Sequence, residues 1–349
     1  MNKLKAGVIG LGMGMGHLHG YLSHPDVEVT AIADARADRI EALSTTAPEF
    51  KGKTYTNGMA MLEAEKLDIV SVVVPNFLHK DLTIAALESG ANVLCEKPMA
   101  MNAAEAEEML AAAKRCGKKL GINFSFRFTP QSRAMKDIVD SGALGDIYYG
   151  RSVWMRRRGI PGLNGGAWFF SKDKAGGGPL IDLGVHRLDL ALWLMGYPEP
   201  AYVMGNTYCP IAGDIAAKQG IEYTVEDFAC AMIKFKNGAS LELDASWAAN
   251  IREAEQMTTR LLGSKGGLHQ YNLNETYTFE VELYNEQYGR QYDTKLHDNS
   301  NAPSAYHMFA DAVRDNSDFL VKPEEGITVM RLLDAIYESG RTGKPVEIK

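Results

Sequence analysis

An aspartate and a histidine stand four residues apart near the middle of the chain, in the segment GGGPLIDLGVHRLDLALWLMG. The apolar residues around them repeat with a helical period, which places Asp182 and His186 on one helix face, one turn apart. A lone histidine in such a pattern would most often be a core or capping residue. An aspartate one turn before it, preceded by three glycines, instead indicates a proton-transfer pair.

A lysine in a second segment, NVLCEKPMAM at residues 92–101, could take part in the same chemistry. A short apolar run ends abruptly there in Glu96, Lys97 and Pro98. A lysine at the end of a buried strand can donate a hydrogen bond to a substrate oxygen and favour its ionised form. Pro98 could hold a cis peptide bond that fixes the turn and aims Lys97 inward. On its own, Lys97 could equally be a solvated strand-end lysine paired with Glu96.

A glycine-rich turn, GLGMGMGH, follows the first apolar run of the chain. The dinucleotide fingerprint is G-x-G-x-x-G between a strand and a helix. Gly10 and Gly12 fit it, whereas Met15 stands where the third glycine should be, with Gly14 and Gly16 on either side. Glycines of this kind allow a tight turn and a close approach of backbone N–H groups to a pyrophosphate at a helix N-terminus.

An acid at the end of the second apolar run supports a dinucleotide site. Asp34 lies about 20 residues after the glycines, where an acid commonly binds the adenosine ribose. The negative charge favours NAD over NADP, because a 2′-phosphate would be repelled. Arg36 and Arg39 follow closely and could weaken this preference, so NADP stays possible.

Pro75, Asn76 and His79 follow the third apolar run, and ligands of open α/β sheets bind at the carboxyl ends of strands. Asn76 is therefore a candidate for contact with the nicotinamide or its ribose, and His79 could either join it or merely begin a helix. The residues predicted to bind the cofactor are Gly10, Gly12, Met13, Gly14, Met15, Gly16, Asp34, Arg36, Pro75, Asn76, His79, Glu96 and Lys97.

Alternating strands and helices must position these residues over the first part of the chain. Strands are expected at residues 4–10, 27–34, 68–74, 92–95 and 119–124, with helical stretches at 17–23, 36–45, 58–65, 78–90 and 103–116. The third strand is apolar almost throughout, as in a parallel sheet covered on both faces. We therefore predict a doubly wound α/β Rossmann domain over residues 1–124.

The pattern changes in residues 125–349, where helices are expected at 130–141, 180–195, 304–314 and 325–339. Two hairpins are expected as well, one turning at Asn237 and Gly238 and the other between Ser264 and Gly267. These elements predict an α+β domain with a large, mostly antiparallel open sheet.

Three motifs together resemble those of the glucose–fructose oxidoreductase/inositol dehydrogenase/rhizopine-catabolism (Gfo/Idh/MocA) family. They are the glycine turn, the E-K-P turn and the segment GGG-x-x-x-D-x-x-x-H, and the ending GRTGKPVEI is also typical. The resemblance covers nearly the whole chain, and it departs from the family at the shifted third glycine. It implies NAD(P)-dependent oxidation or reduction of sugars and polyols, and a sheet face that serves contacts in a homodimer or homotetramer.

The resemblance also implies roles for the catalytic candidates. His186 would remove the hydroxyl proton as hydride leaves the substrate carbon, Lys97 would stabilise the developing alkoxide, and Asp182 would orient the substrate or tune the histidine. Two other functions stay open: an NAD-dependent glycosidase that acts by transient oxidation and elimination, and a non-catalytic NAD-sensing regulator. The candidate proton-transfer residues argue against the regulator.

Residues near the middle of the chain are weaker candidates for substrate contact. The segment YYGRSVWMRRRGIPG, residues 148–162, begins as a strand and ends in three arginines. These could clamp a carboxylate or phosphate, but a solvated basic edge or pairing with acids across an oligomer interface is favoured. Trp168 and its two aromatic neighbours could line a sugar ring or belong to the core. The full set of substrate-side candidates is Lys97, Asn123, Arg127, Arg156, Arg157, Arg158, Trp168, Phe169, Phe170, Asp182, His186, Asp189, Tyr306 and His307.

Composition excludes other classes of partner. The net charge is −7, which argues against nucleic acid or an anionic membrane as the partner. No run of about 18 apolar residues is present to span a membrane. The four cysteines form no C-x-x-C pair, so no metal site is expected, and reduced thiols fit a cytoplasmic protein.

Overall fold

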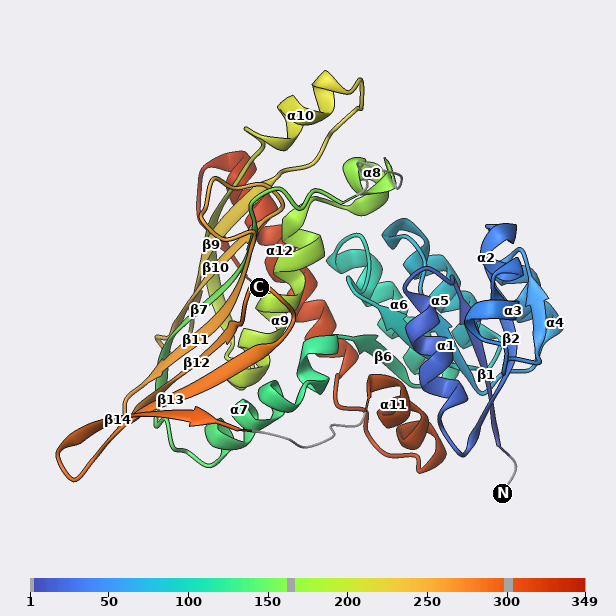
Figure 1. Cartoon of the computed structure of the whole chain (residues 1–349), viewed down its shortest axis with the longest axis horizontal. Helices are drawn as coiled ribbons and strands as arrows, with labels where there is room; N and C mark the ends of the chain where they lie inside the picture. Colours follow the sequence, from blue (N-terminus) through green and yellow to red (C-terminus); the bar gives the residue numbers. More distant parts are fainter. Residues whose placement is uncertain (1–2, 162–166, 298–303, 349) are drawn as a thin grey trace. The chain divides into compact units, whose positions relative to one another are not determined.

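The computed structural model describes residues 3–161, 167–297 and 304–348 (Figure 1). The chain forms two compact units. One consists of Met1–Asn123 with Pro303–Met330, and the other of Phe124–Ala302 with Arg331–Lys349. The chain thus first passes from one unit to the other after Asn123, one residue before the boundary expected after residue 124. Residues 303–330, which the sequence analysis placed in the second domain, belong to the first unit.

The first unit contains a parallel sheet of six strands in the order β3-β2-β1-β4-β5-β6. Five of the strands were predicted, and the sixth, β3, is a three-residue edge strand without a continuous apolar run. The strands are β1 (Leu4–Ile9), β2 (Val27–Ala33), β3 (Lys53–Tyr55), β4 (Ile69–Val72), β5 (Asn92–Glu96) and β6 (Leu120–Asn123). All four residues of β4 are buried, as expected of a central parallel strand.

Helices connect these strands as predicted, except that the stretch 36–45 divides into two short helices. The helices are α1 (Gly14–Leu22), α2 (Ala37–Glu41), α3 (Leu43–Thr46), α4 (Gly58–Ala64), the 3-10 turn η1 (Asn76–Leu78), α5 (His79–Glu88), α6 (Ala103–Cys116), α11 (Ala305–Arg314) and the first part of α12 (Pro323–Thr342). Local chemistry sets their ends. For example, Asn102 caps α6 by accepting from the backbone N–H of Glu105 at 3.0 Å, and Gly117 ends it with φ +63°.

The strand order reverses between β1 and β4, and in such sheets ligands bind beyond the carboxyl ends of the strands at this point. Ile9 pairs with Val72 there, and Val72 pairs with Cys95 on β5. The glycine turn, the Pro75 turn and the Glu96 turn therefore leave the same edge of the sheet from three neighbouring strands, which confirms the predicted fold class.

The second unit contains a sheet of nine strands in the order β14-β13-β12-β11-β7-β10-β9-β8-β15, antiparallel except for the parallel pair β7 and β10. Both predicted hairpins are present, as β9–β10 and β11–β12. The strands are β7 (Ile147–Arg156), β8 (Pro200–Tyr208), β9 (Phe228–Phe235), β10 (Ser240–Ser246), β11 (Glu255–Gly263), β12 (Gly266–Asn272), β13 (Phe279–Gln287), β14 (Arg290–Leu296) and β15 (Val346–Glu347).

Figure 1 shows α7, α9 and α12 along one face of this sheet. The helices of the second unit are η2 (Ser125–Phe128), α7 (Pro130–Asp140), η3 (Ala167–Phe170), α8 (Lys172–Ala175), η4 (Leu180–Gly184), α9 (Val185–Leu194), α10 (Ala212–Lys218) and the end of α12. Every residue of α9 is buried. The sequence analysis predicted one helix over 180–195, but its first turn, η4, is π-helical.

The other face of the nine-stranded sheet carries exposed apolar side chains. Met204 on β8 pairs directly with Met232 on β9, and these side chains are 43% and 47% exposed. Tyr202 and Tyr208 extend the same row of β8.

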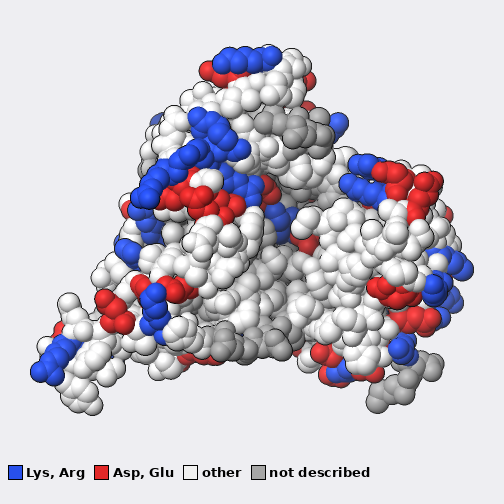
Figure 2. All heavy atoms as spheres, viewed as in Figure 1, with Lys and Arg blue, Asp and Glu red and all other residues white. Residues whose placement is uncertain are grey.

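In the part of the chain that the structure describes, no helix combines the length and the apolar character needed to cross a membrane. Figure 2 shows acidic and basic side chains interspersed on the visible face.

Candidate active site

The glycine turn after β1 requires glycine at its first position. Gly10 has φ +92°, and a Cβ there would lie 1.9 Å from the carbonyl oxygen of Val73. Gly14 begins α1, and its Cβ would lie 3.2 Å from the side chain of Val8 and 3.4 Å from that of Val73. Close packing of the helix on the sheet, the usual task of the third fingerprint glycine, therefore falls to Gly14. This accounts for the one-residue departure from the fingerprint.

The glycines further along α1 serve a different contact. A Cβ on Gly20 would lie 2.3 Å from the ring of Tyr306 on α11, and a Cβ on Gly16 would lie 3.2 Å from its hydroxyl oxygen. His307 lies beside the same helix, with Nε2 2.9 Å from the hydroxyl of Ser23 and from the carbonyl oxygen of Gly20. Gly16 and Gly20 therefore admit α11 against α1, and Tyr306 and His307 hold the two helices together.

Asp34 is buried at the end of β2 and binds the glycine turn directly. Its carboxylate accepts from the backbone N–H of Leu11 at 2.6 Å and from that of Arg36 at 2.8 Å. Nη1 of Arg39 donates to it at 3.2 Å. The Arg36 side chain instead pairs with Asp38 at 2.6 Å. Arg39, rather than Arg36, thus lies beside the predicted ribose position.

Beyond β4, Asn76 is buried and His79 joins two turns. Nε2 of His79 lies 2.8 Å from the carbonyl oxygen of Val74, and Nδ1 lies 2.7 Å from that of Pro98. Burial lowers the pKa of His79, although both carbonyls act in the opposite direction. The Lys97–Pro98 peptide bond is cis, the conformation that the sequence offered as a possibility. His79 therefore holds the turn that carries Lys97.

Glu96 is the centre of a buried polar network, in which Asn123 and Lys97 were predicted site residues and His17 and Ser71 were not. Glu96 Oε1 lies 2.8 Å from Nε2 of His17 and accepts from the amide of Asn123 at 2.6 Å, while Oε2 accepts from the backbone N–H of Lys97 at 3.2 Å. Nδ1 of His17 lies 2.9 Å from the hydroxyl of Ser71. The sequence did contain one indication of this network. Ser71 lies inside the apolar run of β4, and a buried hydroxyl needs a hydrogen-bond partner.

In the second unit, the three glycines before η4 fit against two buried side chains. Gly176 has φ +85°, a Cβ on Gly177 would lie 1.8 Å from the Tyr337 hydroxyl oxygen, and one on Gly178 would lie 2.1 Å from the Glu226 carbonyl oxygen. The carboxylate of Glu226 accepts from the backbone N–H of Gly178 at 2.9 Å, from that of Leu180 at 3.0 Å and from the hydroxyl of Tyr337 at 3.0 Å. Burial raises the pKa of Glu226. Glu226 thus fixes the start of the segment that carries Asp182 and His186.

Asp182 lies in the π-helical turn η4 and His186 in the first turn of α9, so a regular α-helical face does not relate them. Asp182 accepts a hydrogen bond from Nε1 of Trp247 at 3.0 Å. The His186 ring lies 5.2 Å from that of Phe126 and 5.6 Å from that of Trp154. Both candidate side chains are therefore oriented by aromatic residues.

Two of the weaker candidates form a core pair. Arg127 is fully buried, and its Nε and Nη2 donate to the carboxylate of Asp189 at 2.9 and 2.5 Å. Arg127 also donates to the Tyr197 hydroxyl at 2.6 Å. This bidentate arrangement favours a structural role for Arg127 and Asp189 over the contact with substrate that the sequence suggested.

The three consecutive arginines bind their own strand neighbours. Nε of Arg156 donates to Glu255 at 2.7 Å, and Nε of Arg157 donates to the carbonyl oxygen of Ile251 at 2.8 Å. Nη2 of Arg158 donates to the side chain of Asn250 at 2.8 Å. Arg156 thus pairs with an acid of its own chain, whereas the sequence favoured a solvated edge or pairing across an oligomer interface. The last residue of the predicted segment, Gly162, lies outside the described residues.

Trp168 stacks on Phe169 at 3.9 Å, and Phe169 lies 6.3 Å from Trp247, the residue that binds Asp182. Phe170 is buried against Tyr223 at 5.3 Å and belongs to the core.

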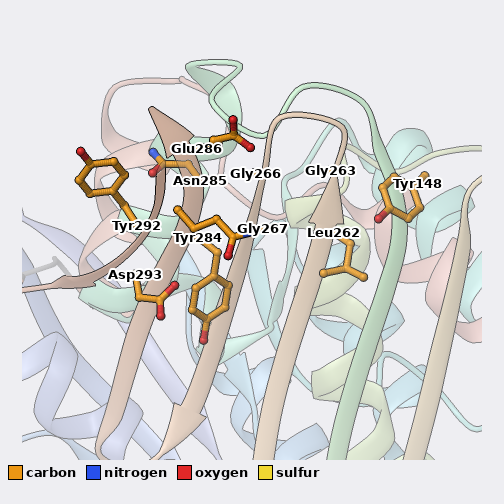
Figure 3. A pocket seen from close by; sticks show the side chains of 11 residues that line it. Tyr148, Leu262, Gly263, Gly266, Gly267, Tyr284, Asn285, Glu286, Tyr292 and Asp293 are labelled. Atoms are coloured by element: carbon orange, nitrogen blue, oxygen red, sulfur yellow. The ribbon is translucent and has the colours of Figure 1, made fainter. Parts of the chain in front are cut away.

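Among the described residues, no cluster of His, Cys, Asp and Glu could hold a metal ion. A cavity of about 350 Å³ in the second unit is lined by residues that were not predicted as site residues, including Tyr148, Tyr284 and Asp293 (Figure 3).

Comparisons with known proteins agree with these features. Residues 4–124 match the model of the oxidoreductase family with an NAD-binding Rossmann fold, and residues 132–269 match that of the GFO/IDH/MocA C-terminal domain. D-glucoside 3-dehydrogenase of Escherichia coli (strain K12) is 32% identical over 99% of this chain and 97% of that protein. Myo-inositol 2-dehydrogenase of Thermotoga maritima is 28% identical over 78% of this chain and 77% of that protein.

Among solved structures, GenD2 from gentamicin A biosynthesis, in complex with NAD, superposes with a TM-score of 0.82 at 26% identity, covering 100% of this chain and 97% of that one. The fold and the glycine turn define an oxidoreductase with an NAD-binding Rossmann domain. The chain belongs to the GFO/IDH/MocA family, as its motifs predicted.

Proposed function

We propose that the protein oxidises a secondary hydroxyl on a closed ring, in a sugar, glycoside or cyclic polyol, with NAD as the hydride acceptor. The observation that carries the proposal is the match to D-glucoside 3-dehydrogenase over 99% of the chain. Myo-inositol, named for a second relative, is also a closed ring with secondary hydroxyls. The reverse reaction, reduction of a ring ketone, uses the same groups.

The first unit fits a dinucleotide. The carbonyl of Val73 leaves no room for a side chain at Gly10, and the carboxylate of Asp34 is fixed to the backbone of the turn by Leu11. These residues, with Asn76, would hold NAD. When bound, NAD supplies an acceptor for hydride. Asp34 supports NAD rather than NADP, because its buried negative charge would repel a 2′-phosphate.

The remaining chemistry is proton transfer and charge stabilisation by the chain itself. His186 removes the hydroxyl proton from the substrate, and Lys97 stabilises the oxygen as negative charge develops on it. Asp182, oriented by Trp247, holds a substrate hydroxyl or stabilises the imidazolium of His186. Each proton-transfer group of this type contributes about 10²–10⁴ to the rate.

A screen of substrates tests the function. The purified protein would be incubated with NAD and methyl glucosides, free glucose, myo-inositol or straight-chain polyols, and NADH absorbance would be followed. We expect NADH to form with at least one ring substrate and a ring ketone as product. NAD binding without NADH formation from any ring substrate would contradict the proposal. Release of nitrophenol from a nitrophenyl glucoside without accumulation of NADH would point to the glycosidase instead.

We also propose that the protein is a cytoplasmic homo-oligomer. The exposed apolar row on β8 and β9 supports contact with a second copy, because such patches mark interaction sites. The four cysteines are free thiols, which supports a reducing compartment.

A further inference from the structure

The residue after His186 places a cation in an aromatic enclosure. The side chain of Arg187 is fully buried. Its guanidinium carbon lies 4.6 Å from the centre of the Phe126 ring, 5.2 Å from that of Phe279 and 5.4 Å from that of Trp154. Rings at these distances stabilise a cation through their quadrupoles. They do not replace the hydrogen bonds that the guanidinium loses when it leaves water.

The hydrogen bonding of Arg187 is incomplete among the described residues. Nη1 donates to the side-chain oxygen of Gln270 at 3.2 Å, whereas Nε and Nη2 have no hydrogen-bond partner there. Gln270 in turn donates to the hydroxyl of Ser132 at 3.1 Å. Burial lowers the pKa of Arg187 to about 9, and it stays protonated near neutral pH. A buried cation with unfilled donors costs stability, so a purely structural role explains it poorly.

The enclosure of Arg187 is shared with His186. The imidazole lies 5.2 Å from the centre of the Phe126 ring and 5.6 Å from that of Trp154, the same rings that contact the guanidinium. The imidazole and guanidinium are therefore at most about 10 Å apart, a separation over which buried charges are weakly screened. A cation at this range disfavours a second positive charge on His186.

Several other charges on the elements packed against α9 have partners of opposite sign, and Glu255 and Tyr277 interact electrostatically with Arg187. In the described residues these pairs are Arg127 with Asp189, Lys136 with Asp140, Arg151 with Asp244, and Arg156 with Glu255. Asp182, bound to Trp247, acts in the sense opposite to Arg187, because its charge favours the imidazolium. The carboxylate of Asp182 and the guanidinium of Arg187 thus act on the ionisation of His186 in opposite senses.

We propose that Arg187 is a positioning residue for His186: its buried charge keeps the imidazole neutral and ready to accept a proton, and its packing fixes the Phe126 and Trp154 rings against the imidazole. The proposal rests on the proposed function, in which His186 is the base. Arg187 itself touches neither substrate nor cofactor in this role.

Two substitutions remove the effect of the charge in different ways. Arg187→Met keeps an elongated side chain that packs against aromatic rings. Gln270→Glu keeps the size of the partner and gives the guanidinium a counter-ion. The titration of His186 would be followed by NMR in histidine-labelled protein, with its signal assigned from the His186→Gln variant. In both variants the midpoint of this titration should rise by about one pH unit. Arg187→Lys, which keeps a positive charge, should move it less.

Activity and stability provide further readouts. With a substrate in hand, the lower limb of the pH profile of kcat/KM should move upward with the NMR titration, and NAD affinity should not change. The melting temperature of Arg187→Met should be equal to that of the wild type or higher, since replacing a buried ion with an apolar side chain is often neutral or stabilising.

The outcomes separate this inference from the proposed function. A His186 titration that is the same in wild type, Arg187→Met and Gln270→Glu would overturn the inference, even if the enzyme is active. A loss of stability without a shift of that titration would show a structural role only, and would also overturn it. Full turnover by His186→Ala would instead refute the proposed role of the histidine, while the NMR titration would still report whether Arg187 controls its protonation.

Discussion

Nε2 of His17 lies 2.8 Å from Oε1 of Glu96, and this contact joins the helix after the glycine turn to the end of the strand that precedes Lys97. The carboxylate also binds the amide of Asn123 and the backbone N–H of Lys97. The helix after the glycine turn and the turn that carries Lys97 are thus both bound to the carboxylate of Glu96. Glu96, predicted from the sequence as a cofactor-binding residue, thus supports the turn that carries Lys97.

Glu96→Gln should therefore change how stability depends on pH. Burial would raise the pKa of Glu96, but the hydrogen bond and charge of His17, with Asn123 and Lys97, lower it below 4.5. Because the folded pKa is lowered, the ionised carboxylate stabilises the fold above pH 4.5, and this contribution is lost as the pH falls through the folded pKa. The variant should be less stable by about 1–3 kcal/mol at neutral pH, with the difference shrinking in acid. Urea unfolding at several pH values measures this. A difference independent of pH would contradict it.

Lys97→Ala should lower kcat and kcat/KM together by about 10²-fold or more and leave NAD affinity nearly unchanged, because Lys97 acts mainly in the transition state. His186→Ala should behave in the same way and lose the lower limb of its pH profile. The double variant should fall little further, because both groups serve one proton transfer. Lys51→Ala and His269→Ala, which alter residues outside the candidate site, are matched controls. If Lys97→Ala kept most of its turnover, the lysine would be no more than a strand-end charge.

NAD should bind more tightly than NADP. Asp34→Ser should reduce that preference by about tenfold, corresponding to about 1.4 kcal/mol, because the substitution removes the repulsive charge and releases Arg39 for a 2′-phosphate. Asp38→Ser, which removes only the partner of Arg36, is the control. Titration of both dinucleotides by calorimetry gives the ratio. Equal or tighter binding of NADP by the wild type would mean that the positive charge of Arg39 outweighs the repulsion of the 2′-phosphate by Asp34.

Arg127→Met should destabilise the protein by about 3–5 kcal/mol, because the buried carboxylate of Asp189 would lose its arginine counter-ion. Replacing both residues with apolar side chains should recover most of this loss. Urea unfolding of the two variants makes the comparison. Normal stability of Arg127→Met, together with a raised KM, would instead support the contact with substrate that the sequence suggested.

Met232→Glu should dissociate the proposed oligomer, because it places a charge in the apolar row opposite Met204. Met59→Glu provides a control of the same chemistry, since Met59 is 44% exposed on α4 in the first unit. Light scattering at micromolar concentration measures the mass of each. A monomeric wild type would refute the oligomer.

Features that depend on local backbone chemistry could be predicted from the sequence. The parallel strands follow from their apolar runs, the β9–β10 turn from Asn237 and Gly238, and the cis bond from the position of Pro98. The partners of buried polar groups could not be predicted in the same way. Glu226 and Tyr337 are 111 residues apart, and neither lies in a recognisable motif.

Other misses have a similar origin. The parallel pairing of β7 with β10 leaves no local signal, because the two strands are far apart in the chain. A π-helical turn has nearly the same apolar pattern as an α-helical one, so the spacing of Asp182 and His186 suggested a regular helix. Arg127 was predicted as a weaker candidate for contact with substrate, because its partner, Asp189, lies 62 positions away and nothing local in the sequence indicates the pair.

The division of α12 between the two units has a consequence for synthesis. Residues 303–330 complete the first unit, where Phe319 lies so close to β6 that a Cβ on Gly121 would be 2.8 Å from its ring. A ribosome makes these residues only after it has made 124–302. The nucleotide-binding half therefore begins to fold first and is completed nearly last, so an amino-terminal fragment that ends at residue 124 would emerge without part of its own core.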